Sequence, residues 1–112
     1  MKKINIVKKN TEFNNIIKIG KKYSNDIFYI YIVDNSYSYN RYGISVSKKV
    51  GNAVTRNLYK RRIKDIIDDM DIKFNSKDVV IISRPKLKFC DYNYIRNSII
   101  KIFSMIGEEY EK

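Results

Sequence analysis

Apolar residues change their spacing several times along the chain, and each spacing predicts a different element. Spacings of three and four residues are typical of a helix with one buried face, and alternation or a short apolar run is typical of a strand. The first pattern predicts helices over residues 10–19, about 52–70 and 91–107. The second predicts strands over residues 27–33, 41–47 and 79–82, with a further short strand possible over 21–24.

Short polar residues and glycines stand where these helices should begin and end. Asn10, Asn52 and Asp91 carry side-chain oxygens that can accept a hydrogen bond from a free backbone N–H in a first helical turn. Gly20 and Gly107 follow the first and last helical patterns, and glycine commonly ends a helix. We therefore expect three helices with defined ends.

The order of the elements predicts a single α+β domain, an α/β sandwich with the order αββ(β)αβα. The run 79–82 is apolar throughout, as in a strand covered on both faces. Strand 41–47, the long helix and this strand form a βαβ unit, and a chain of 112 residues has room for one hydrophobic core. Residues 1–9 are expected to be a flexible basic arm.

One face of strand 41–47 is small and polar. A two-residue period places Gly43 and Ser45 on the same side, which leaves a floor that no large side chain fills. Tyr29 and Tyr31 share one side of the preceding strand. If the two strands are neighbours, these tyrosines could form a wall beside the floor.

Charge and missing residue types narrow the possible functions. The chain has 23 Lys and Arg against 12 Asp and Glu, a formal net charge of +11, which favours a polyanionic partner, nucleic acid before membrane. It has no histidine and one cysteine, which excludes His-dependent catalytic triads and structural zinc sites and fits a reducing compartment. Neither a spanning apolar run of about 20 residues nor a signal peptide is present. We expect a cytoplasmic protein.

The cations concentrate around the start of the long helix. No acid occurs between Asp34 and Asp65. Arg56, Lys60 and Lys64 are four residues apart, so successive cations rise about 6 Å along one helix face, comparable with a phosphate repeat. A solvated face that keeps the protein soluble is the alternative to RNA binding. The residues that we expect to bind RNA are Lys48, Lys49, Arg56, Asn57, Lys60, Arg61, Arg62 and Lys64.

A longer motif spans the strand 41–47 and the start of this helix. It is the run GISVSKKVGNAV at 43–54, followed by Arg56-Asn57 and Lys60-Arg61. The motif resembles the signature of the bacterial ribonuclease P protein component, and the element order and length agree over nearly the whole chain. The resemblance implies a fold similar to the second domain of ribosomal protein S5 with a left-handed βαβ crossover, although about 98% of such crossovers are right-handed.

The resemblance also implies a division of labour with an RNA. In this family the protein binds a large catalytic RNA and the single-stranded 5′ leader of precursor tRNA, and the RNA holds the Mg²⁺ that cleaves the phosphodiester bond. The protein then has no catalytic residue, cofactor, metal site or small-molecule substrate of its own, and no membrane partner. By position, the residues that contact the catalytic RNA are Lys48, Lys49, Arg56, Asn57, Lys60 and Arg61, and we expect Arg62 and Lys64 to add to this surface. The leader cleft lies between the first helix and the sheet and comprises Phe13, Ile17, Tyr31 and Ser45.

Pattern and resemblance disagree at a few of these positions. Pattern alone places Phe13 in the core, and it leaves Tyr29 open between packing and cleft. Leu58 stands where the family usually has a third basic residue, and Arg62, four residues on, stands where an apolar residue is usual, so the two look like an exchange along one helix edge. Ile17 replaces an aromatic residue, which weakens one stacking platform.

Two other functions compete with this interpretation. A ribosomal or other structured-RNA-binding protein could use the same basic helix without any role in catalysis. A self-sufficient metal nuclease could use Asp65, Asp68 and Asp69, but two-metal chemistry needs carboxylates that converge from several elements, and these lie on one helix end. We expect the protein subunit of a ribonucleoprotein endonuclease, with bond breaking done by the RNA.

Overall fold

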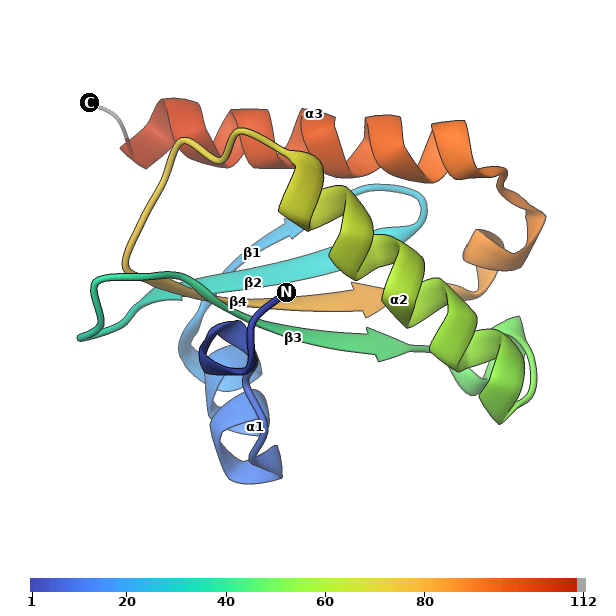
Figure 1. Cartoon of the computed structure of the whole chain (residues 1–112), viewed down its shortest axis with the longest axis horizontal. Coiled ribbons are helices and arrows are strands. Elements are labelled where there is room, and N and C mark those ends of the chain that lie inside the picture. Colours follow the sequence, from blue (N-terminus) through green and yellow to red (C-terminus); the bar gives the residue numbers. More distant parts are fainter. Residues whose placement is uncertain (111–112) are drawn as a thin grey trace.

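A mixed four-stranded sheet divides the protein into two layers of different depth (Figure 1). The computed structural model describes residues 1–110. The helices are α1 (Asn10–Ile19), α2 (Ala53–Asp69) and α3 (Tyr92–Tyr110). The strands are β1 (Lys21–Ser24), β2 (Phe28–Asp34), β3 (Arg41–Val46) and β4 (Lys77–Ser83). Three short 3-10 turns are η1 (Lys3–Asn5), η2 (Lys48–Val50) and η3 (Pro85–Phe89).

The strands are ordered β1-β2-β4-β3, with β3 parallel to β4 and the other pairs antiparallel. The predicted βαβ unit, the α+β class and the short strand 21–24 are therefore confirmed. The idea that the tyrosines neighbour strand β3 is wrong, because β4 lies between β2 and β3. In register, Tyr29 lies opposite Ile82, and Ile82 lies opposite Ser45 on its other side.

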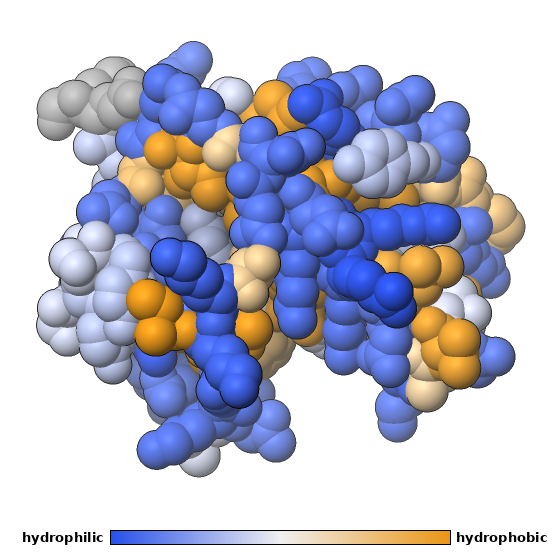
Figure 2. All heavy atoms as spheres, viewed as in Figure 1, coloured by the Kyte–Doolittle hydropathy of each residue, from blue (hydrophilic) through white to orange (hydrophobic). Residues whose placement is uncertain are grey.

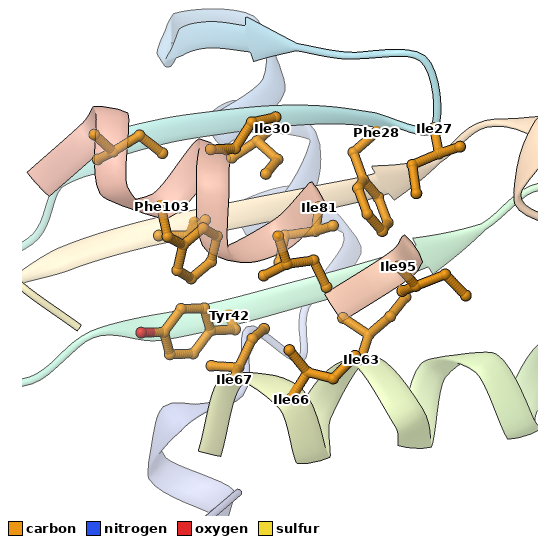
Figure 3. Packing of buried hydrophobic residues seen from close by; sticks show 14 of the residues in the cluster. Ile27, Phe28, Ile30, Tyr42, Ile63, Ile66, Ile67, Ile81, Ile95 and Phe103 are labelled. Carbon is orange, nitrogen blue, oxygen red and sulfur yellow. The ribbon is translucent and has the colours of Figure 1, made fainter. Parts of the chain in front are cut away.

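The main core lies between the sheet and the pair α2 and α3 (Figure 3). Alternate β2 residues Phe28, Ile30 and Ile32 point into it and are fully or almost fully buried, as their two-residue period predicts. The α2 residues that face them recur at helical spacing, as predicted: Ile63, Ile66 and Ile67. From α3 come Ile95, Ile99, Ile102, Phe103 and Ile106. This is the layer that stabilises the fold.

The second layer is thin and is formed by α1 alone. Only Ile16 of α1 is buried, against Val80 of β4 and Val7 of the N-terminal segment. Val80 lies between Val79 and Ile81, which point to the main core, so β4 is covered on both faces as its continuous apolar run predicts. Phe13 and Ile17 remain half-buried. The α1 face of the sheet is thus only partly covered.

Three helix ends are as predicted and two are not. The helix α1 ends at Ile19, with Gly20 as its C-cap residue. The Asn52 side chain accepts a hydrogen bond from the Thr55 N–H (2.9 Å), and the Asp91 side chain accepts one from the Tyr94 N–H (2.9 Å). Asn10 does not cap α1, because the helix begins at Asn10 and the cap position is Lys9, which makes no side-chain cap bond. Gly107 does not end α3 either.

Gly107 is buried inside α3 because the chain before β4 passes close to it. A Cβ at this position would lie 3.0 Å from the Lys73 Cβ. The residue is therefore a glycine for space rather than as a helix stop, and α3 continues to Tyr110.

The segment predicted as a basic arm includes residues that lie against the sheet. Ile6 forms a parallel bridge with Tyr42, and the Val7 N–H donates to the Tyr42 carbonyl oxygen (2.9 Å). Val7 is buried. This contact covers the start of the outer edge of β3 and leads the chain directly into α1.

Candidate nucleic-acid interface

A partly buried ion-pair network connects α1 to its side of the sheet. The Arg41 guanidinium donates to both carboxylate oxygens of Asp78, from Nε at 2.8 Å and from Nη2 at 2.6 Å. The same Nη2 donates to Glu12 of α1 at 2.8 Å. The hydrogen bonds that Arg41 donates to Asp78, and then to Glu12, raise the pKa of Arg41. The network joins β3, β4 and α1, so it sets the distance between α1 and the sheet.

Phe13 of α1 packs directly over β3, and Gly43 makes this possible. A Cβ on Gly43 would lie 2.8 Å from two carbon atoms of the Phe13 ring. The small polar floor predicted from the sequence is therefore present, and it receives an aromatic ring. The other predicted cleft residues on this layer, Ile17 and Tyr31, pack half-buried against the same small cluster as Phe13.

Beside Phe13 the surface opens into a hollow of about 360 Å³, which we call the β3 hollow. Phe13 lines it from α1, and Ile44 and Ser45 line it from β3. Lys60 and Lys64 line it from α2. The structure thus brings two residues predicted to bind the leader together with two predicted to bind the catalytic RNA.

The same face of the sheet carries basic residues around Tyr29. The Lys22 Nζ lies 4.3 Å from the centre of the Tyr29 ring, and the Arg84 guanidinium carbon lies 4.7 Å from it. Lys22 is also 5.9 Å from the Tyr31 ring. Sequence reasoning left Tyr29 undecided and did not consider Lys22 or Arg84. Alternation along β4 could have indicated Arg84, because it follows Ile82 by two residues.

The basic loop before α2 is short and ordered by local hydrogen bonds. Ser47 Oγ accepts a hydrogen bond from the Lys49 N–H (3.2 Å), and Val50 anchors the turn in the main core. Lys48 and Lys49 are exposed. Since the anchor faces inward and the lysines face solvent, both cations are available to a partner.

On α2 the predicted RNA-binding residues divide into two rows. Arg56, Lys60 and Lys64 are half-buried, whereas Asn57, Arg61 and Arg62 are exposed. Across residues 1–110, no salt bridge uses any Lys or Arg of this loop and helix. Arg56 Nε is buried and finds no hydrogen-bond partner in the described part of the chain. An unpartnered buried donor is unfavourable, so the Arg56 side chain gains from any rearrangement that gives Nε a hydrogen-bond acceptor.

The exchanged pair Leu58 and Arg62 lies on the outer surface of α2. Leu58 is 38% exposed, and the Arg62 guanidinium carbon lies 5.7 Å from the centre of the Tyr59 ring. Arg62 therefore has a fixed aromatic support beside the other cations. Its position keeps a cation on this edge, as the exchange predicts.

The acidic end of α2 does not gather a metal site. Asp68 pairs with the N-terminal amine of Met1. Among residues 1–110, no three His, Cys, Asp or Glu side chains come together in a way that could hold a metal ion. Nor is any helix in this part of the chain long and apolar enough to cross a membrane.

A basic helix and loop beside a partly open aromatic face is the arrangement that the resemblance implied, and comparison with known proteins decides the family. The family model for ribonuclease P matches residues 1–107. The chain belongs to the ribonuclease P protein family. In that family the protein is a subunit of the ribonucleoprotein endoribonuclease that acts on tRNA precursors, so the identification made from the motif is confirmed.

Relatives of the ribonuclease P family match almost end to end. The ribonuclease P protein component of Mycoplasma mycoides is 44% identical over 108 residues, which cover 95% of this chain and 99% of the relative. That of Clostridium botulinum is 40% identical, covering 94% and 96%.

Solved structures agree with the fold. The Staphylococcus aureus RNase P protein superposes with a TM-score of 0.84 at 35% identity, covering 91% of this chain and 94% of that one. The Thermotoga maritima RNase P protein gives a TM-score of 0.75 at 30% identity, covering 82% and 88%. The predicted fold class is confirmed.

Proposed function

We propose that this chain is the protein subunit that binds the catalytic RNA of ribonuclease P and the single-stranded 5′ leader of precursor tRNA, in the cytoplasm. The observation that carries the proposal is the β3 hollow. It places the half-buried ring of Phe13 and the cations of α2 on one surface, and those cations have no acidic partner within residues 1–110.

The outer surface formed by the basic loop and the exposed row of α2 suits the catalytic RNA. Its cations neutralise phosphates and release counterions, which gives affinity without sequence preference. Figure 2 shows hydrophilic side chains spread over this side of the molecule. The planar guanidinium groups of Arg61 and Arg62 add bidentate hydrogen bonds to phosphates.

The α1 side of the sheet suits the leader. Phe13, Tyr31 and Tyr29 offer aromatic faces, on which unpaired bases stack regardless of their identity. Lys64 lines the β3 hollow opposite Phe13 and can hold the leader backbone, and Lys60 lies where this hollow meets the surface for the catalytic RNA. Sequence-independent stacking fits a substrate whose leaders differ between transcripts.

The protein's contribution to catalysis is then positioning. Holding the leader fixes the scissile bond over the metal site of the RNA, and good alignment alone can remove a large part of a reaction barrier. The Mg²⁺ that supplies the chemistry is held by the RNA, and the protein needs no cofactor.

A cleavage assay with precursor tRNA tests this function. The purified chain alone should not cut, the catalytic RNA at physiological salt should cut slowly, and the two together should cut faster. Arg56→Ala with Lys60→Ala should abolish most of the stimulation of cleavage. It should also make the plot of log affinity for the RNA against log salt concentration less steep, by a slope of roughly one per lost phosphate contact. Arg96→Ala with Lys101→Ala, which removes two exposed cations from α3, is the matched control.

Two results would contradict the proposal. Binding of RNA without any stimulation would point to a structured-RNA-binding protein outside catalysis. Cutting by the chain and Mg²⁺ alone would point to a protein nuclease.

A further inference from the structure

Aromatic side chains lie exposed at a place that the proposed function does not use. Phe89 at the end of η3 is 79% exposed, and Tyr94 in the first turn of α3 is 44% exposed. The two rings line one open hollow of about 430 Å³, which we call the η3 hollow, together with Lys86, Cys90, Asp91 and Asn97. An exposed apolar residue standing alone is ordinary, but two aromatic rings around one hollow form a binding surface.

The acids near the η3 hollow are already partnered. Asp26 accepts hydrogen bonds from Lys86 Nζ (2.9 Å) and from the Tyr94 hydroxyl. Asp91 is occupied as the cap of α3, where it accepts from the Tyr94 N–H. The bonds to Tyr94 hold that residue in place, and the ion pair with Lys86 offsets the charge of Asp26.

A lysine lies beside the hollow, and an asparagine lines it. The Lys88 Nζ lies 4.9 Å from the centre of the Phe89 ring. A cation beside an exposed ring is the usual combination in sites that bind single-stranded nucleic acid. The Asn97 side chain, with donors and an acceptor, lines the hollow at a point where a base edge could be read.

The η3 hollow adjoins the basic loop. η2 and η3 lie side by side, and the Ser47 N–H donates to the Ser83 carbonyl oxygen (3.3 Å) just before both turns. Figure 1 shows these two turns at the same end of the sheet. The turn that carries Phe89 therefore lies beside the turn that carries Lys48 and Lys49.

We propose that the η3 hollow stacks an unpaired base of the same RNA subunit that the basic loop binds, with Phe89 as the platform. This inference rests on the proposed function, because it extends that RNA surface from η2 onto η3. Tyr94 forms the second wall, and Lys86 and Lys88 are near enough to meet the adjoining phosphates.

The absence of tryptophan from the sequence allows a direct test of stacking. Phe89→Trp places a single tryptophan at the hollow, and its fluorescence should be quenched when the catalytic RNA of ribonuclease P is added. Met105→Trp, at another exposed apolar position further along α3, should be little affected. Equal quenching of the two tryptophans, or none, would overturn the proposal.

Affinity for the RNA gives a second measurement. Phe89→Ala should weaken binding about tenfold, within the range measured for one stacked base, whereas Phe89→Tyr should keep the affinity. Met105→Ala is the control. Because Phe89 is mostly exposed, its replacement should leave the circular dichroism spectrum and the unfolding midpoint unchanged.

The outcomes separate this inference from the function on which it rests. Full affinity in Phe89→Ala, together with loss of binding in Arg56→Ala with Lys60→Ala, would remove the η3 site and leave the function standing. Loss confined to precursors that carry a leader would assign the hollow to the substrate and overturn the proposal. If the unmodified protein bound no RNA, both this inference and the proposed function would be overturned.

Discussion

The two faces of the sheet are made from the same strands but are covered very differently. On one face α2 and α3 seal a core in which Phe28, Ile30 and Ile81 have no exposed surface. On the other, α1 buries only Ile16 and leaves Tyr29 and Tyr31 half-exposed beside cations. The first face can therefore supply the stability of the fold, and the second is free to bind.

Neighbouring isoleucines of β4 give the sharpest test of this difference. Ile81 points into the sealed core and is fully buried, whereas Ile82 points to the α1 face and is half-buried. Ile81→Ala should lower the free energy of unfolding by about 2–5 kcal/mol, because it leaves a cavity among close-packed side chains. Ile82→Ala should cost about 1 kcal/mol. Urea denaturation of both variants measures the two losses of free energy of unfolding. Similar losses would contradict the claimed difference between the two faces.

Alkaline pH should also lower the stability of the protein through Tyr42, which packs in the sealed core. Burial raises the pKa of Tyr42 to about 12, from an ordinary value of 10.0. A raised pKa in the folded state favours the protonated form, so this stabilisation is complete below pH 10 and is lost as the pH rises toward 12. The loss in free energy of unfolding should reach about 2–3 kcal/mol.

Tyr42→Phe is the comparison for that experiment. The free energy of unfolding of the unmodified protein, relative to Tyr42→Phe, should be constant below pH 10 and fall above it. A difference that stays flat up to pH 12 would show that Tyr42 titrates normally and that this part of the core is open to water.

A smaller loss of stability than that of Ile81→Ala is expected at the floor of the open face. Gly43→Ala places a methyl group against the Phe13 ring, which must move. We expect a loss of about 1–2 kcal/mol in stability, since overpacking strains neighbouring side chains. The displaced ring should weaken leader binding more than RNA-subunit binding. Equal weakening of the two would mean that Phe13 only supports the fold.

Much of this contrast could be predicted from the sequence, because helix and strand periods are local. The α2 stripe of Ile63, Ile66 and Ile67 and the alternation in β2 identified the sealed core correctly. Asn52 and Asp91 were correct caps for the same reason. At Gly107, however, the deciding contact comes from Lys73, far along the chain, so a rule for local helix ends failed.

The open face depends on long-range pairing, and there prediction from the sequence was incomplete. Nothing local shows that β4 inserts between β2 and β3, so the tyrosines were placed beside the wrong strand. The basic residues of α2 were treated as one surface. Their division into two rows follows from helical spacing, because Arg56, Lys60 and Lys64 are four residues apart. The position of Lys60 and Lys64 at the β3 hollow depends on long-range packing, since residues 6 and 7 and α1 form part of its wall.

The central claim is that the open face binds the leader while the basic loop and helix bind the catalytic RNA. The most direct measurement is the affinity of the assembled enzyme for precursor tRNA with and without a leader, in the unmodified protein and in Tyr31→Ala. We predict that Tyr31→Ala weakens binding of the leader-bearing precursor about tenfold, as expected for one lost stacking contact, and leaves the leaderless substrate unchanged. An equal loss for both substrates, or no loss for either, would contradict the account.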